Sequence, residues 1–270
     1  GLPSGLDYAM PARVQAGCPY GFCGAYWDGN GMTFGAGDGW SCDDFGLYSD
    51  VIYHEYTHAV TSKVYGGVAL PYFMESGALN EGWSDYFACL LSPSQEPLIG
   101  DGGLLLEQPE GFQTLDNGFR RETDFTSTVH FDSQMVSGSL WEIRQNIGMS
   151  PELWDTVAHF ARYDHPQTFE EYLVALLLED DTRFGDGYLA NSTPHGETIF
   201  TAFGNHGIGG LRYIAPSIVI GDDGGNSNGR LEPGENCRLS LSLFNGWADA
   251  TNIYAVLESA DAFVRIIKAR

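Results

Sequence analysis

One short motif, His54-Glu55-Tyr56-Thr57-His58, constrains this chain more than any other feature. Two histidines four residues apart share one face of a helix, so both imidazoles can bind the same cation. The glutamate between them lies beside the first histidine, where its carboxylate can hold a metal-bound water rather than the metal. The motif therefore predicts a catalytic Zn²⁺ site on a helix, with His54 and His58 as ligands and Glu55 as general base.

A third ligand is expected on a following helix, and Glu81 in Asn80-Glu81-Gly82-Trp83-Ser84-Asp85 is the candidate. The chain between His58 and Glu81 is long enough for a turn and a helical return. Asp85 lies one helical turn beyond Glu81, where its carboxylate can accept the outer N–H of a ligand histidine. Two histidines and one glutamate leave a fourth position open, which is typical of catalytic zinc.

The charge balance restricts the partners of the chain. It has 36 Asp+Glu against 13 Lys+Arg, a formal net charge of −23. Such an excess of carboxylates argues against nucleic acid or an anionic membrane as partner and favours Ca²⁺ binding or a salty extracellular setting. The chain has no run of 18 apolar residues, so we expect no transmembrane segment. A hydrophobic content of 43% is sufficient for a folded core.

The cysteines indicate a disulfide near the N-terminus. Cys18, Cys23 and Cys42 all lie in a glycine-rich segment, where a disulfide would stabilise a chain without regular secondary structure. A Cys18–Cys23 bridge is favoured, with a bridge to Cys42 as the alternative. Zinc binding by these thiols is the rival, but their spacing lacks the pairs typical of zinc ribbons and fingers. Cys89 lies in an apolar run and is expected to be a buried free thiol.

The apolar pattern divides the chain near residue 210. Residues 1–49 alternate in short segments that suit strands and turns, and 92–130 are expected to be rich in loops. A helix should begin after Ser49 or Asp50 as N-cap and stop near Gly66 and Gly67. Further helices are expected over 78–91, 138–147, 151–162, 168–178 and 195–203, and strands over 213–220, 237–244 and 253–257.

Two stretches carry a resemblance to a known family. Residues 75–85, Glu-Ser-Gly-Ala-Leu-Asn-Glu-Gly-Trp-Ser-Asp, resemble the glutamate-ligand helix of thermolysin-like and fungalysin-like metallopeptidases. Residues 25–39 resemble the edge strand of that family, which lies antiparallel to bound substrate. The resemblance covers roughly 20–210 and implies an α+β fold: a short β-rich N-terminal part, active-site helices and a mainly helical C-terminal lobe. It implies a secreted, extracellular or cell-surface zinc endopeptidase acting on peptides or proteins.

The resemblance also implies roles for individual residues. Tyr72 and His130 would donate hydrogen bonds to the oxyanion that forms when the peptide carbonyl is attacked, and the Ala25 carbonyl would hold the substrate backbone. Arg120, with Arg121 as alternative, would lie beneath the substrate carbonyl. An apolar pocket for the residue after the scissile bond would be lined by Phe119, Val51 and Phe45.

Three features depart from the family pattern. Gly24 stands where thermolysin-like enzymes place an asparagine, the loop before Tyr72 is longer, and only about fifty residues precede the motif. They motivate an alternative, in which the protein keeps the metallopeptidase fold, is weakly active or inactive, and serves as a structural or adhesive extracellular component. The N-terminal lobe is expected to be truncated, and the chain to derive from a larger precursor with further domains or chains.

The tail has a separate character. Residues 211–270 are expected to begin a β-sandwich of the immunoglobulin-like kind, after a metallopeptidase domain over 1–210. An acidic segment in this tail offers clustered oxygen ligands for structural Ca²⁺, although a plain Asn/Gly turn is the alternative. The candidate calcium ligands are Asp222, Asn226, Asn228 and Glu235.

Overall fold

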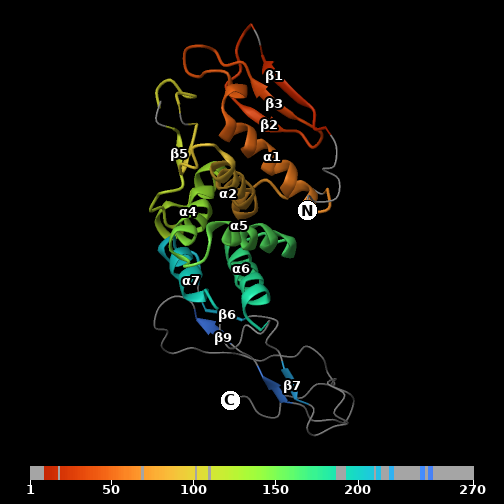
Figure 1. The fold of residues 1–270 in the computed structure, drawn as a ribbon, viewed down its shortest axis with the longest axis vertical. Helices are drawn as coiled ribbons and strands as arrows, with labels where there is room; N and C mark the ends of the chain where they lie inside the picture. The colour runs from red at the N-terminus through yellow and green to blue at the C-terminus, as the bar shows by residue number, and fades with distance from the viewer. Residues whose placement is uncertain are drawn as a thin grey trace.

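The computed structural model describes residues 9–209, except 18, 68–69, 101, 109–110 and 187–192, together with four short strands of the tail. A small sheet lies on one side of helix α1 (Ser49–Val64), and the remaining helices lie on the other side (Figure 1). The chain thus places the HExxH helix between a β-rich part and a helical part, in agreement with the α+β fold that the resemblance implies.

The N-terminal sheet contains β1 (Ala12–Ala16), β2 (Ala25–Trp27) and β3 (Met32–Gly35), in the order β1-β3-β2. β3 pairs in parallel with β1 and antiparallel with β2. Between this sheet and α1 lies a hydrophobic cluster, called here the small cluster, that includes β3, α1 and the 3₁₀ turn η1 (Phe45–Leu47). Its buried members are Met32, Phe34, Cys42, Phe45, Val51 and Leu104.

The start of α1 differs from the prediction by one residue. The N-cap is Tyr48, and Ser49 already belongs to the helix. Asp50 is buried in the first turn, where its carboxylate accepts hydrogen bonds from the Val51 and Gly100 backbone N–H groups. An acidic side chain beside a helix N-terminus is stabilised there without acting as the cap. The predicted stop is confirmed, because Gly66 and Gly67 have positive φ.

Helices α2 (Met74–Leu91) and α4 (Val129–Asn146) both begin before their predicted starts. The first turns of α4 contain Asp132 and Ser133, which are buried and polar, so apolar periodicity does not reveal them. The two helices pack closely: a Cβ at Gly82 would lie 2.9 Å from the Ser133 carbonyl oxygen. This crossing brings the start of α4 beside the predicted ligand helix.

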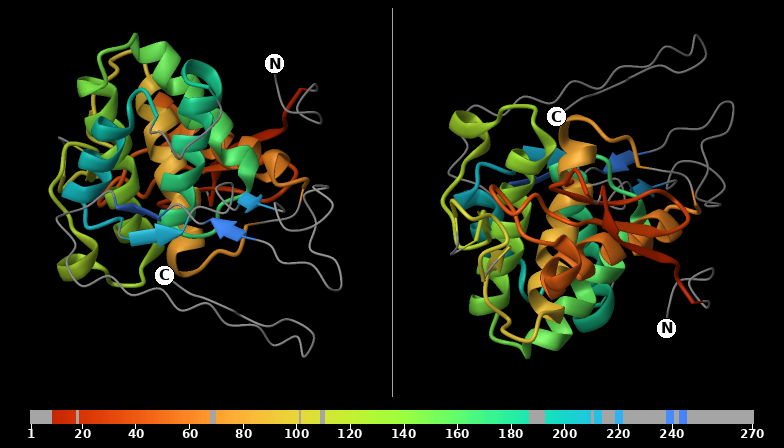
Figure 2. Two further views of the ribbon diagram at one scale, coloured as in Figure 1. Left: turned by 90° about the horizontal axis from the view of Figure 1, so that it is seen from below. Right: turned by 90° about the horizontal axis from the view of Figure 1, so that it is seen from above.

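The helical part is built by α2, α4 and three further helices, α5 (Pro151–Phe160), α6 (Phe169–Phe184) and α7 (Gly196–Asn205), with a 3₁₀ turn η2 (Ala161–Asp164) (Figure 2). Their ends follow local sequence: the Ser150 side chain caps α5, and Thr168 with Glu171 forms a capping box on α6. These helices surround the large cluster, whose members include Leu79, Trp83, Leu140, Trp154, Tyr172 and Phe203.

Between α2 and α4, the expected loop contains three short elements: β4 (Leu98–Ile99) pairs with β5 (Gln113–Thr114), and α3 (Arg121–Asp124) follows. In the tail, β6 (Leu211–Tyr213) pairs with β9 (Leu243–Asn245), and β7 (Val219–Gly221) pairs with β8 (Arg238–Ser240). The strand predicted over 253–257 and the calcium candidates Asp222, Asn226, Asn228 and Glu235 lie outside the described residues.

One disulfide joins Cys23 to Cys42. The favoured Cys18–Cys23 pairing is therefore wrong, and the alternative bridge to Cys42 is confirmed; Cys18 itself lies outside the described residues. Cys89 is a buried free thiol, as predicted. In the described part of the chain, no helix is both long and apolar enough to cross a bilayer.

Candidate metal centre

Helices α1 and α2 bring His54, His58 and Glu81 together, with one ligand atom of each within 4.8 Å of the others. His54 Nε2 lies 3.0 Å from His58 Nε2 and 3.1 Å from Glu81 Oε2, and His58 Nε2 lies 3.5 Å from Glu81 Oε1. Tetrahedral zinc with bonds of about 2.0–2.1 Å separates its ligand atoms by about 3.3–3.4 Å. These donor atoms therefore fit one Zn²⁺ ion.

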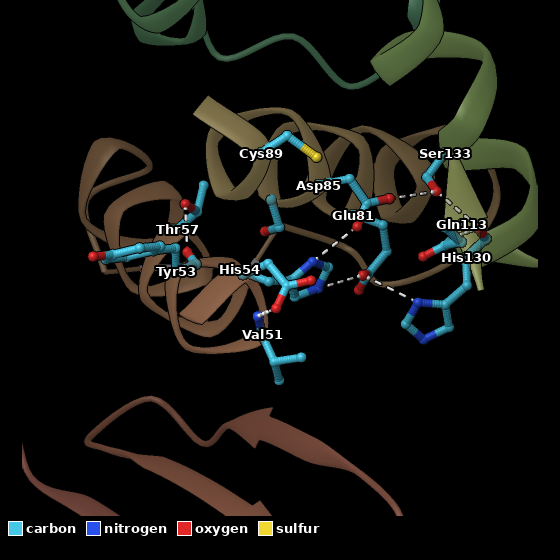
Figure 3. Close-up of polar contacts among 12 residues, drawn as sticks. Val51, Tyr53, His54, Thr57, Glu81, Asp85, Cys89, Gln113, His130 and Ser133 are labelled. Carbon is cyan, nitrogen blue, oxygen red and sulfur yellow. Dashed lines mark hydrogen bonds and ion pairs between the residues drawn. The ribbon is translucent and has the colours of Figure 1, made fainter. Parts of the chain in front are cut away.

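The outer nitrogens of both histidines face polar side chains of α2. Asp85 Oδ1 lies 2.9 Å from His54 Nδ1, a close ion-pair contact without the alignment of a hydrogen bond (Figure 3). His58 Nδ1 lies 3.1 Å from both Asn80 Oδ1 and Ser84 Oγ. The contact of Asp85 was expected. The contacts of Asn80 and Ser84 were not, although both residues are within one helical turn of Glu81.

The electrostatics of the cluster favour a bound cation. Burial lowers the pKa of His54, but the Asp85 and Glu81 carboxylates outweigh it and hold that pKa well above its ordinary value. Burial raises the pKa of Glu81, yet His58, His130 and His54 together hold it well below its usual range. Glu81 and Asp85 are both 1% exposed. With both imidazoles neutral, the two buried carboxylates carry two uncompensated negative charges, which a divalent cation would neutralise in place of the imidazole protons.

Glu55 lies on the sheet side of this cluster. It is 5% exposed, and its Oε2 has no hydrogen-bond partner. Burial raises the pKa of its carboxyl group, while His54, His58 and the Trp27 backbone N–H favour the charged form. A carboxyl group with a raised pKa and an oxygen without a hydrogen-bond partner is suited to accepting a proton and releasing it again.

Tyr72 and His130 reach the same carboxylate from different segments. The Tyr72 hydroxyl donates to Glu81 Oε1, and His130 Nδ1 lies 3.1 Å from Glu81 Oε2. The two side chains also contact each other, with 3.2 Å between Tyr72 Oη and His130 Nε2. Figure 3 shows the His130 ring, from the start of α4, turned toward Glu81. Tyr72 and His130, both selected from the sequence, therefore lie together at the edge of the cluster.

The backbone of His130 is fixed by two residues that sequence reasoning missed. Gln113 Nε2 and Ser133 Oγ both donate to the His130 carbonyl oxygen. Ser133 Oγ also lies 3.4 Å from Asp85 Oδ2, which links the start of α4 to the ligand helix. Asp124, six residues before His130 in the chain, accepts from the Arg120 backbone N–H at the start of α3.

The remaining predicted residues lie in two regions. Val51 belongs to the small cluster, whereas Phe119 packs against the large cluster. The centres of the Phe119 and Phe131 rings lie 4.9 Å apart. Arg120 donates to the Asn205 carbonyl oxygen and pairs with Glu122. Ala25 is in β2, the edge strand beside α1. The structure therefore divides the side chains of the expected apolar pocket between two clusters.

Arg121, the alternative to Arg120, forms an ion pair at the start of the ligand helix α2. It pairs with Glu75, in the first turn of α2, and with Glu170 of α6. Glu75 also accepts a hydrogen bond from the Phe169 backbone N–H. Arg121 therefore joins the starts of two helices.

Comparison with known proteins agrees with this geometry. The family profile for the catalytic domain of thermolysin metallopeptidase matches residues 4–62, and that for fungalysin metallopeptidase matches 37–103. The two matches together include the HExxH motif and Glu81. This chain is related to the thermolysin-like and fungalysin-like metallopeptidases. The resemblance seen in residues 25–39 and 75–85 is thereby confirmed.

Individual metallopeptidases match longer parts of the chain. A gelatinase of Enterococcus faecalis is 25% identical over 229 residues, which cover 77% of this chain and 43% of the gelatinase. Thermolysin of Alicyclobacillus acidocaldarius is 45% identical over 157 residues, which cover 52% of this chain and 28% of that protein. This chain thus spans less than half the length of either relative.

The fold is also similar to a solved structure. The precursor of protealysin, a metalloproteinase from Serratia proteamaculans, aligns with a TM-score of 0.58 at 22% identity, covering 68% of this chain and 65% of that one. The matched part of the chain therefore has a thermolysin-like metallopeptidase fold.

Proposed function

We propose that this chain is a zinc-dependent endopeptidase. The observation that carries the proposal is the convergence of His54, His58 and Glu81 with a buried Glu55 beside them. When bound, Zn²⁺ would polarise a peptide carbonyl and lower the pKa of a coordinated water to about 7. The three side chains would be its protein ligands, with the fourth position open to water and substrate.

Each surrounding residue has a role in this proposal. Glu55 accepts a proton from the attacking water and passes it to the leaving amine. Tyr72 and His130 donate hydrogen bonds to the oxygen that becomes negatively charged on the substrate. Asp85 fixes the orientation and tautomer of His54. The free edge of β2, at Ala25, holds the substrate backbone.

Substrate preference and setting belong to the same proposal. We assign to this chain a preference for an apolar residue after the scissile bond, contacted by Val51 or Phe119 from the two separate clusters to which these side chains belong, with Arg120 near the substrate carbonyl. An extracellular or cell-surface location agrees with the net charge of −23 and with a relative named extracellular metalloprotease, from Pectobacterium carotovorum. We further assign residues 1–210 to the peptidase domain and 211–270, with structural Ca²⁺, to the start of a β-sandwich within a longer precursor.

The decisive experiment combines metal analysis with proteolysis. The purified chain should contain one zinc per molecule and digest casein, and a chelator should abolish the digestion. The Glu55→Gln variant should retain zinc and lose the activity, because glutamine cannot take the proton. An unchanged rate in Glu55→Gln would overturn the assignment of the base. Zinc without any cleavage by the wild-type chain would instead support the structural or adhesive alternative.

A further inference from the structure

The edge strand β2 has one side paired and one side open. Gly35 N donates to the Gly24 carbonyl oxygen at 2.8 Å, and Asp28 N donates to the Gly31 carbonyl oxygen at 3.1 Å. In an antiparallel pair, alternate residues direct their N–H and C=O groups to the partner strand. Since 24 and 28 face β3, the backbone groups of Ala25 and Trp27 point to the outer edge. None of the described strands pairs with that edge.

The outer edge of β2 faces the catalytic side of α1. The Trp27 N–H lies close enough to the Glu55 carboxylate to favour its charged form, and β2 packs against α1 (Figure 1). Ala25, two residues earlier on the same edge, keeps its outward N–H and C=O for an added strand. The position of this backbone relative to Glu55 therefore decides where an extended peptide would lie.

β2 is held weakly by its own ladder. It has three residues, and Gly24 before it offers no side chain to the protein or to a peptide. Cys23 immediately precedes Gly24 and is joined by the disulfide to Cys42. Cys42 is completely buried in the small cluster, which also contains Val51 of α1. The disulfide thus ties the entry of β2 to the core beneath the metal helix.

The other end of the disulfide is itself fixed. Asp38 Oδ1 accepts hydrogen bonds from the Trp40, Ser41 and Cys42 backbone N–H groups, and Asp38 Oδ2 accepts from the Ser41 hydroxyl. Behind this loop, Asp43 N donates to the Leu104 carbonyl oxygen. Cys42 is therefore a rigid anchor, and β2 is the element that the disulfide restrains.

We propose that the Cys23–Cys42 disulfide is a positioning device for peptide binding, which holds the outer edge of β2 at Ala25 in register with Glu55. The proposal rests on the proposed peptidase function and deepens it. It concerns extended peptides of several residues, because only these can pair with β2. A substrate of two residues would bind at the metal centre without using the edge and would not depend on the disulfide.

The test compares two substrates in the full chain with zinc bound. For the Cys23→Ser/Cys42→Ser double variant, we expect KM for an eight-residue peptide to rise about tenfold, the equivalent of losing one or two edge hydrogen bonds. We expect kcat for that peptide, and KM for an N-acylated dipeptide amide, to stay within about twofold. Asp38→Ala, which keeps the disulfide and loosens its anchor, should raise KM in the same direction by less. Cys89→Ala, which removes the buried thiol of α2, is the control and should change neither KM.

A binding measurement separates this proposal from the proposed function. A fluorescent eight-residue peptide is titrated by anisotropy into Glu55→Gln, with and without the two cysteine substitutions. Weaker binding without the disulfide supports the positioning role even if the wild-type chain cleaves no substrate, in which case only the peptidase function fails. Equal binding with and without the disulfide overturns the proposal, as does an equal rise of KM for both substrates, which would indicate general loosening of the fold.

Discussion

Asp85 Oδ1 lies 2.9 Å from His54 Nδ1, while His54 Nε2 faces Glu81 on the opposite side of the same ring. When a metal ion replaces the proton on Nε2, the Asp85 carboxylate favours keeping the remaining proton on Nδ1, which leaves Nε2 as the metal-binding atom. The relationship joins two helices through one ring. The two carboxylates also explain why the pKa of His54 is raised, because burial alone would lower it.

The first prediction concerns this carboxylate. Replacing Asp85 by Ala should weaken zinc binding about 10- to 100-fold, because the orienting partner of a ligand histidine is lost. Competition with a chromogenic chelator measures the affinity. Asp155→Ala, which removes a partly buried carboxylate bound to Tyr86 and Arg144 of the helical part, is the control and should leave zinc affinity unchanged. Equal zinc affinities of Asp85→Ala and the wild-type chain would contradict the assigned role.

The second prediction concerns the phenol at the edge of the cluster. Tyr72→Phe should lower kcat about a hundredfold, because one hydrogen bond to the developing oxyanion is removed. Zinc content should stay at one per chain. Tyr163→Phe, at a 41% exposed tyrosine of η2, is the matched control and should keep the wild-type rate. A Tyr72→Phe variant with full kcat would exclude the tyrosine from the reaction.

A third prediction tests the crossing of α2 and α4 that brings His130 to Glu81. A Cβ at Gly82 would lie 2.9 Å from the Ser133 carbonyl oxygen, so Gly82→Ala must push the helices apart. Overpacking of this kind costs about 1–3 kcal/mol, more than the roughly 1 kcal/mol that alanine gains in a helix interior. Urea denaturation should show a lower free energy of unfolding. Gly118→Ala, whose Cβ would meet no heavy atom within 4 Å, should be nearly neutral.

The fourth prediction is a pH dependence of stability. His159 is partly buried beside Arg162, and burial together with that cation lowers its pKa to about 4. An unfolded His159, with a pKa of about 6.5, binds its proton more readily than the folded one, so stability is complete above pH 6.5 and falls as the pH drops toward 4. After discounting for its partial exposure, the loss should be about 1 kcal/mol. His159→Gln should remove this part of the pH dependence in denaturation curves from pH 7 to 4, and a variant curve parallel to the wild type would contradict it.

Sequence patterns predicted the elements whose ends are encoded locally. α1, α5 and α6 begin or end at residues that act through their own backbone or side chain, such as Ser150, Thr168 and Gly66. The grouping of His54, His58 and Glu81 was also predictable, because it follows from helical spacing and a familiar local motif. These features depend on neighbours in the chain, so one sequence is sufficient to reveal them.

Other features depend on contacts between distant segments and could not be read in this way. The first turns of α4 contain the buried hydroxyl of Ser133, whose partner Asp85 lies 48 residues earlier, on α2. The pairing of Cys23 with Cys42 depends on how the loop before η1 folds over the small cluster. The division of Val51 and Phe119 between two clusters likewise follows from packing, which spacing along the chain does not specify.

The most direct test of the central claim is an anomalous difference map, recorded at the zinc absorption edge from crystals of the full chain grown with zinc. We expect one strong peak about 2.0–2.2 Å from His54 Nε2, His58 Nε2 and a carboxylate oxygen of Glu81. The peak should be absent in crystals of Glu81→Ala. No peak among these three residues in the wild-type chain, or an undiminished peak in the variant, would contradict the zinc centre proposed here.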